Sequence, residues 1–170
     1  MREKNSLKHS CFVGSAEGLG TANVVEINIF MLVMEKIVKI LLIEDDKIDQ
    51  NQVKRVLDQK GILYRMRVVV DGQDALHFLE NDNHTEFHGD PDIILLDINL
   101  RQTNGMEFLS EFRKKGKWDG IKVFVLSNSD EERGRMSEIG VSGYITKPIK
   151  LSNPSRDTIS FLIDLMNICE

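Results

Sequence analysis

Five short segments of strand type recur between residues 38 and 146, and they constrain the fold more than any other feature of the chain. They are Val38–Ile43, Leu63–Val70, Asp92–Asp97, Ile121–Leu126 and Gly143–Thr146. The first segment is almost continuously apolar, which is typical of a strand that is buried on both faces of a sheet. The second is rich in valine, a residue type that strands favour. The sequence therefore predicts five strands.

Stretches with helical spacing follow these segments. They are Lys47–Gln59, a helix capped by Asp71, Gly105–Lys114, a helix from Ser129 to about Gly140, and a last helix that begins at Asn153-Pro154. Asp71, Ser129 and Asn153 are residue types that cap the first turn of a helix. The positions expected to face the core are Ile48, Val53, Val56 and Leu57 in the first helix, Ala75, Leu76, Phe78 and Leu79 in the second, Met106, Phe108, Leu109 and Phe112 in the third, and Ile159, Leu162, Leu165, Met166 and Cys169 in the last.

The alternation of strands and helices predicts an α/β fold. Strands joined by helices form a parallel sheet with right-handed crossovers, which places helices on both faces of a doubly wound, five-stranded sheet. In such sheets ligands bind beyond the carboxyl ends of the strands, where the strand order reverses. A site is therefore expected among the residues that follow the strands.

Charged and polar residues stand at the ends of four of the five predicted strands. They are Glu44 and Asp45 after the first strand, Asp97 and Asn99 at the third, Ser127 at the fourth and Lys147 at the fifth. Taken singly, an acidic residue or a lysine at such a place is usually a helix cap or a strand end, and Asp46 fits a cap. Their joint occurrence in this order indicates one shared site.

The acidic residues of this set suit a Mg²⁺ site. Mg²⁺ prefers oxygen ligands, which the carboxylates of Glu44, Asp45 and Asp97 and the main-chain carbonyl of Asn99 supply. Three neighbouring carboxylates repel one another, so raised and coupled pKa values are expected when no metal ion is bound. A divalent cation would relieve this repulsion.

The same set suits the acceptance of a phosphoryl group. Asp97 is the candidate nucleophile, because carboxylates are known to form aspartyl phosphates. Lys147 and Ser127 are placed to neutralise or hydrogen-bond the oxygens of the transferred group. Such a transfer depends on positioning and charge stabilisation more than on acid–base catalysis.

Composition argues against several other classes of protein. The chain has 170 residues, enough for about one domain, and its net charge of -5 argues against a nucleic-acid-binding surface. Cys11 and Cys169 stand near opposite ends without metal-type spacing, which favours a reducing cytoplasm over a disulfide framework. The apolar stretch Val24–Met34 is too short for a membrane span and contains Glu26 and Asn28.

Residues 1–37 lack clear periodicity and form an N-terminal extension to a domain that covers residues 38–170. One interpretation is a disordered tail or an artefact of the assigned start codon, with Met31 or Met34 as the true start. The other interpretation is an accessory strand or helix that docks on the domain.

Residues 38–169 resemble a receiver domain of the two-component response-regulator family. The matching motifs are Ile40–Asp46, Pro91–Leu100 with Asn104-Gly105, Val125–Ser127 and Gly143–Pro148. The resemblance is to single-domain regulators such as those of chemotaxis, and the long loop Asn81–Pro91 resembles the regulators that partner bacterial phytochrome kinases. It implies the flavodoxin-like strand order 2-1-3-4-5.

The resemblance also implies roles for the residues of the site. Asp97 would accept a phosphoryl group from a sensor histidine kinase. Glu44, Asp45, Asp97 and the main-chain carbonyl of Asn99 would bind Mg²⁺, the implied cofactor. Lys147 would contact the phosphoryl group once it has been transferred.

Ser127 and Tyr144 would form the switch that reports phosphorylation. The Ser127 hydroxyl would move towards the phosphoryl group, and Tyr144 would rotate into the vacated space. This would remodel the face made by the fourth helix, the fifth strand and the fifth helix of the domain. Tyr144 has the alternative interpretation of an ordinary half-buried strand aromatic.

The resemblance also implies that the peptide bond between Lys147 and Pro148 is cis.

A stand-alone receiver of this kind would signal by protein–protein contact, since no output domain follows within the sequence. It would catalyse its own phosphorylation and dephosphorylation without being an enzyme for a separate substrate. The implied partners are the kinase, a histidine phosphotransfer protein and a second copy of the chain, with no nucleic acid or membrane. The surplus apolar content of the last helix suits a homodimer or packing against the N-terminal extension.

Two residues near the site depart from the family pattern. Arg101 stands where many members have proline after the phosphoacceptor loop, which makes this loop less rigid. Asn128 follows Ser127 where a small residue is usual, which narrows access to the phosphoryl group and would slow its hydrolysis.

Three other functions compete with this interpretation. Phosphatases of the haloacid-dehalogenase type also combine an aspartate nucleophile with Mg²⁺, but they place Asp-x-Asp after the first strand, and Asn99 cannot act as a general acid. A pseudo-receiver would keep the fold without phosphorylation, but it usually lacks the acidic residues or the lysine. Against a flavin site, the acidic residues Glu44–Asp46 would repel the FMN phosphate.

Overall fold

The computed structural model of the protein describes residues 37–81, 87, 89–101, 104–128, 140–149 and 156–169. Its strands are β1 (Val38–Ile43), β2 (Tyr64–Val69), β3 (Ile93–Asp97), β4 (Lys122–Ser127) and β5 (Gly143–Thr146), and its helices are α2 (Lys47–Gln59), α3 (Gly72–Glu80), α4 (Gly105–Lys114) and α6 (Arg156–Cys169). Residues 1–36 of the N-terminal extension, the helix predicted after Ser129 and the predicted cap at Asn153 lie outside the described residues.

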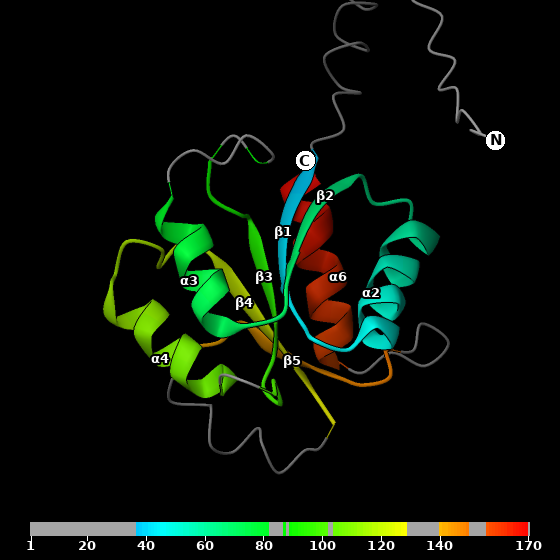
Figure 1. Ribbon diagram of the computed structural model, residues 1–170. Coiled ribbons are helices and arrows are strands. Elements are labelled where there is room, and N and C mark those ends of the chain that lie inside the picture. Colours follow the sequence, from blue (N-terminus) through cyan, green and yellow to red (C-terminus); the bar gives the residue numbers. More distant parts are fainter. Residues whose placement is uncertain are drawn as a thin grey trace, which may run out of the picture. The chain divides into compact units, whose positions relative to one another are not determined.

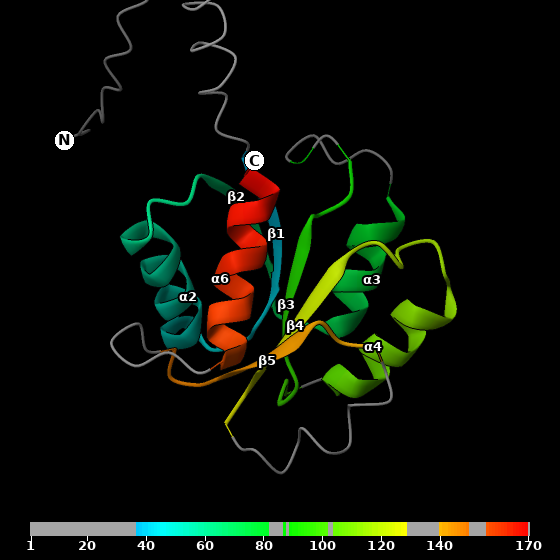
Figure 2. The same ribbon diagram turned by 180° about the vertical axis from the view of Figure 1, so that it is seen from behind.

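The five strands form one parallel sheet in the order β2-β1-β3-β4-β5. The predicted doubly wound arrangement and the flavodoxin-like strand order are therefore confirmed. Helices α2 and α6 cover one face of the sheet, and α3 and α4 cover the other (Figures 1 and 2). The strand order reverses between β1 and β3, which makes their carboxyl ends neighbours.

Both faces of the central strands are buried, which explains their almost continuous apolar sequence. Along β1, Leu41 and Ile43 pack with the α3 and α4 side chains, whereas Ile40 and Leu42 pack with those of α2 and α6. The side chains of β3 alternate between the two faces in the same way. Burial of apolar surface on both faces is the main stabilising term that holds these strand ends in place.

The helices beside the site begin at side chains that accept backbone hydrogen bonds. Asp46 caps α2, and its Oδ1 accepts from the N–H of Ile48 at 2.6 Å and from that of Asp49 at 3.3 Å. Asn104 caps α4 with a hydrogen bond of 3.0 Å. Asp71 caps α3 as predicted, and the predicted cap role of Asp46 is also confirmed. Each cap contributes about 1 kcal/mol and fixes where a loop at the site ends.

Two side chains that were predicted to face the core point to solvent instead. Ile48 is 69% exposed and Ile159 is 44% exposed. Because a helix turns about 100° per residue, Ile48 lies roughly 140° around α2 from the buried Val53, and Ile159 lies roughly 160° around α6 from the buried Phe161. The other predicted core positions are buried or half-buried, except Met166 and Cys169, whose side chains lie outside the described part of the chain.

The predicted strand bounds differ from the observed bounds by no more than one residue. β2 runs from Tyr64 to Val69 and pairs with β1 over this range. The flanking Leu63 and Val70 lie beyond these pairs and are 46% and 47% exposed.

None of the described helices has the length and apolar character needed to cross a bilayer.

Candidate functional site

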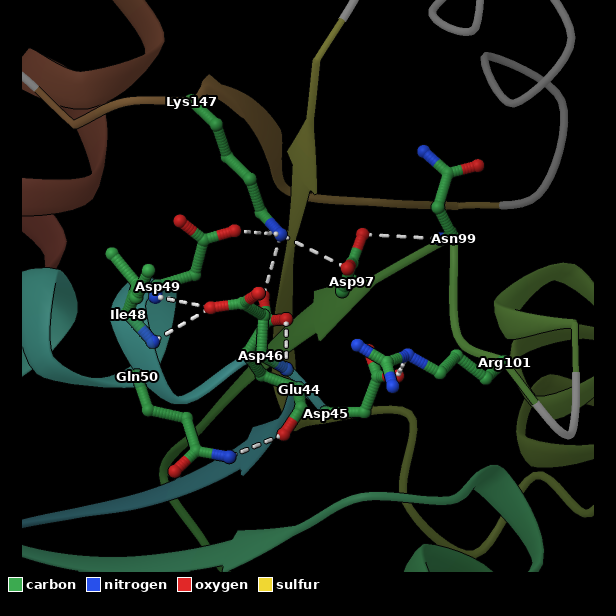
Figure 3. A network of polar contacts seen from close by, with 10 residues as sticks. All are labelled: Glu44, Asp45, Asp46, Ile48, Asp49, Gln50, Asp97, Asn99, Arg101 and Lys147. Atoms are coloured by element: carbon green, nitrogen blue, oxygen red, sulfur yellow. Dashed lines mark hydrogen bonds and ion pairs between the residues drawn. The ribbon is translucent and has the colours of Figure 1, made fainter.

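Side chains from three strand ends converge at the carboxyl edge of the sheet (Figure 3). Glu44 and Asp45 follow β1, Asp97 ends β3, and Lys147 follows β5. In the sheet, β4 lies between β5 and β3, and β1 is the next strand beyond β3. The Lys147 side chain therefore reaches past β4 to contact Asp97 at the end of β3 and Glu44 after β1. The structure therefore brings together the acidic residues and the lysine that the sequence predicted to share a site.

Asp97 lies at the centre of this group, with its side chain only 6% exposed. Its Oδ1 accepts a hydrogen bond from the Asn99 backbone N–H at 3.0 Å, and its Oδ2 accepts one from the Lys147 ammonium at 2.9 Å. The Gly105 N–H donates to the Ile98 carbonyl at 3.2 Å. A Cβ atom on Gly105 would lie 2.6 Å from the Asp97 carbonyl oxygen, so the start of α4 packs directly against the end of β3.

The Lys147 ammonium is almost fully buried and donates to three carboxylates. Its Nζ lies 2.6 Å from Glu44 Oε2, 2.9 Å from Asp49 Oδ2 and 2.9 Å from Asp97 Oδ2. Burial alone would lower the pKa of Lys147, but the hydrogen bonds to these carboxylates outweigh burial and raise it. The Lys147 backbone N–H donates to the Ser127 carbonyl at 2.8 Å, which ties the ends of β4 and β5 together.

Glu44 is fully buried, and burial dominates its ionisation. Burial raises the pKa of Glu44 to about 7, although hydrogen bonds from Lys147 and from the Asp46 N–H favour the charged form. The charge of Asp97 also raises this pKa, in agreement with the predicted effect of crowded carboxylates. The Gln50 side chain holds the backbone here, because its Nε2 donates to the Glu44 carbonyl at 2.7 Å.

Glu44, Asp45 and Asp97 form an acidic cluster that fits a divalent cation. Each residue offers one carboxylate oxygen, and these oxygens lie within 4.8 Å of one another. Such hard oxygen donors are the ligands that Mg²⁺ prefers. Asp45 Oδ2 is buried and accepts no hydrogen bond among the described residues, although the Arg101 guanidinium lies 2.9 Å from it. Ligation by the main-chain carbonyl of Asn99 stays a prediction.

Ser127 and Tyr144 lie on neighbouring strands near these residues. Ser127 ends β4 and is 2% exposed, and Tyr144 on β5 pairs in register with Val125 on β4. The half-buried Tyr144 packs against the apolar pair of Ile98 and Val125. This position suits both a switch residue and an ordinary strand aromatic, so the switch stays a prediction.

The Lys147-Pro148 peptide bond is cis, as the resemblance implied.

Sequence reasoning missed two charged residues at the site. Asp49, in the first turn of α2, contributes a fourth carboxylate through its contact with Lys147. Arg101 forms an ion pair with Asp45, with 2.9 Å between Nε and Oδ2, whereas the sequence only suggested a less rigid loop there. The place of Asp49 three residues after the Asp46 cap is a usable signal, because it puts an acid in the first helical turn at the site.

The strand order, with acidic residues after β1 and at the end of β3 and a lysine after β5, defines the receiver class of signalling domains. Residues 40–154 match the model of the response regulator receiver domain, and the chain therefore belongs to this family. The family resemblance seen in the sequence is confirmed by this match.

Individual relatives support the same assignment. Response regulator Rcp1 of Synechocystis sp. is 34% identical over 116 residues, which cover 67% of this chain and 79% of Rcp1. The solved structure of the bacteriophytochrome response regulator RtBRR is 33% identical with a TM-score of 0.64, over 76% of this chain and 78% of that chain. The Mn²⁺-bound form of Rcp1 is 32% identical with a TM-score of 0.57, over 68% and 84%.

Some relatives are considerably longer than the matching region. The transcriptional regulatory protein SphR of Synechococcus elongatus is 32% identical over 114 residues, but these residues cover only 43% of SphR. The similarity to such regulators therefore concerns their receiver part.

Proposed function

We propose that this protein is a cytoplasmic response regulator whose receiver domain accepts a phosphoryl group from a sensor histidine kinase onto Asp97, with Mg²⁺ as cofactor. The position of Asp97 carries the proposal. One of its carboxylate oxygens is held by the Asn99 N–H, and the other lies 2.9 Å from the buried Lys147 ammonium. A buried carboxylate next to a cation and two further acids is arranged for phosphoryl acceptance.

The transfer itself is a simple substitution at phosphorus. An Asp97 carboxylate oxygen forms a bond to phosphorus while the bond between phosphorus and the imidazole nitrogen of the donor histidine breaks. The electron pair of that bond stays on the nitrogen. The Lys147 ammonium, already beside Asp97, hydrogen-bonds the oxygens of the arriving group, and the Ser127 hydroxyl is the further donor.

Glu44, Asp45 and Asp97 would hold the Mg²⁺ ion, because their carboxylate oxygens form the acidic cluster. When bound, the ion supplies positive charge that stabilises the oxygens of the transferred phosphoryl group. The related protein Rcp1 has been solved in a Mn²⁺-bound form, which supports a divalent cation for this family member.

We further propose that phosphorylation is passed on through Ser127 and Tyr144. Movement of the Ser127 hydroxyl towards the phosphoryl group would let Tyr144, which contacts Val125 and Ile98, change its packing. The output surface would include β5, α6 and the predicted helix after Ser129. A histidine phosphotransfer protein or a second copy of the chain would bind there. Similarity to RtBRR favours a kinase of the phytochrome type as input.

Intact-mass spectrometry after incubation with acetyl phosphate and Mg²⁺ tests this function. We expect wild type to gain the mass of one phosphoryl group only when Mg²⁺ is present, and Asp97→Asn to gain none. Asp90→Asn, at an exposed position before β3, is the matched control and should behave as wild type. Absence of the adduct in folded wild type, together with no binding of beryllofluoride, would favour the alternative of a phosphorylation-independent pseudo-receiver that acts as an interaction module.

A further inference from the structure

Arg101 connects the loop after β3 to the acidic cluster. Its Nε lies 2.9 Å from Asp45 Oδ2, and Figure 3 shows the two side chains meeting from the loop after β3 and the end of β1. The Arg101 side chain is 80% exposed, whereas the Asp45 side chain is only 15% exposed. The pair therefore joins a solvated cation to a largely buried carboxylate.

The contact leaves Asp45 incompletely satisfied. Although the guanidinium is close, its N–H groups are not aligned with the carboxylate, and Asp45 Oδ2 accepts no hydrogen bond within the described part of the chain. A well-aligned arginine–carboxylate pair would make two parallel hydrogen bonds. Charge attraction thus holds this pair together, and Asp45 retains the capacity to bind another cation.

Lys147 and Arg101 divide the three carboxylates of the acidic cluster between them. Lys147 contacts Glu44 and Asp97, and Arg101 contacts Asp45. Each member of the cluster therefore has a positive side chain beside it before a metal ion enters. A divalent cation that binds Asp45 must either displace the guanidinium or bind next to its positive charge. Either event costs free energy and therefore weakens metal binding.

We propose that Arg101 is an internal counter-ion that competes with Mg²⁺ for Asp45 and thereby sets the affinity of the metal site. This inference rests on the proposed function, because it takes Glu44, Asp45 and Asp97 as the metal ligands. Since the Arg101 side chain is largely exposed, it leaves Asp45 at the small free-energy cost typical of a surface ion pair. The competition therefore weakens metal binding without preventing it.

Mn²⁺ titration of the metal-free protein tests the competition without any phosphoryl donor. The EPR signal of free Mn²⁺ gives the affinity directly. We expect Arg101→Gln to bind Mn²⁺ about three- to fivefold more tightly than wild type at low ionic strength, as follows from loss of a partly exposed ion pair. Arg101→Lys, which keeps the charge, should bind more weakly than Arg101→Gln. Raising the salt concentration should shrink these differences.

Arg55→Gln is the matched control, because Arg55 is an exposed arginine of α2 and its replacement changes the net charge equally. It should bind Mn²⁺ as wild type does. Equal affinity of wild type and Arg101→Gln would overturn the inference while leaving the metal site in place. Equal tightening by both glutamine variants would also overturn it, since total charge would then suffice. A lack of Mn²⁺ binding by every variant would refute the metal site and the inference together.

Discussion

The Lys147 ammonium lies 2.9 Å from Asp97 Oδ2, although 50 residues separate the two in the chain. The contact joins the ends of β3 and β5 across β4, and the same ammonium also meets Glu44. Buried carboxylates are costly unless a cation or hydrogen-bond donors compensate them. Lys147 therefore has a structural role in the metal-free protein besides its proposed contact with the phosphoryl group.

Replacing Lys147 by methionine should destabilise the metal-free protein by about 3 kcal/mol at pH 8, because the buried Glu44 and Asp97 lose their shared cation. Urea unfolding in the presence of EDTA, followed by circular dichroism, measures the change. Lys114→Met, at an exposed position of α4, serves as the control and should shift stability by less than about 0.5 kcal/mol. Equal unfolding midpoints for Lys147→Met and wild type would contradict the structural role.

Burial of Glu44 should make stability depend on pH. The pKa of Glu44 is raised from 4.5 to about 7 in the folded protein, so the folded state binds more protons than the unfolded chain across this window. Stability from this group is therefore lost as the pH rises through the window. Glu44→Gln mimics the protonated form, and relative to wild type it should gain about 3 kcal/mol between pH 4.5 and pH 8.

Urea midpoints of wild type and Glu44→Gln at several pH values, all in EDTA, measure this gain. The comparison cancels the titration of groups that both proteins share. A stability difference between the two proteins that stays constant with pH would show that burial does not control the ionisation of Glu44.

A side chain at position 105 should be destabilising, because a Cβ atom on Gly105 would lie 2.6 Å from the Asp97 carbonyl oxygen and 2.8 Å from Ile98 Cα. Both neighbours are backbone atoms, so the end of β3 must shift. Gly105→Ala should lose about 2 kcal/mol of stability and slow phosphorylation by acetyl phosphate. Gly120→Ala is the control, since a Cβ atom at Gly120 meets nothing within 4 Å. Wild-type stability in Gly105→Ala would refute the tight packing.

The sheet was predictable from the sequence because its signal is local. Strands that are buried on both faces have continuously apolar sequences. The bounds predicted from this pattern for β1 and β3 agree with the observed bounds to within one residue. Caps such as Asp46 and Asp71 act on their own helices, so they too can be recognised from neighbouring residues. The placement of polar residues at strand ends then followed from the parallel topology.

The parts of the site that escaped prediction depend on contacts between distant segments. Whether Asp49 reaches Lys147 depends on how α2 lies relative to the end of β5. Whether Arg101 meets Asp45 depends on the path of the loop after β3. Ile48 was misplaced for a related reason, since hydrophobic character alone does not fix which face of a helix turns inward.

Chemical trapping can identify the residue of this protein that carries the phosphoryl group, which we propose to be Asp97. Sodium borohydride reduces an aspartyl phosphate to homoserine, which tandem mass spectrometry locates in a digest. After incubation with acetyl phosphate and Mg²⁺, we expect homoserine at Asp97, and none there when EDTA replaces Mg²⁺. Homoserine at Asp45 or another acidic residue, with Asp97 unmodified, would show that Asp97 is not the phosphoacceptor.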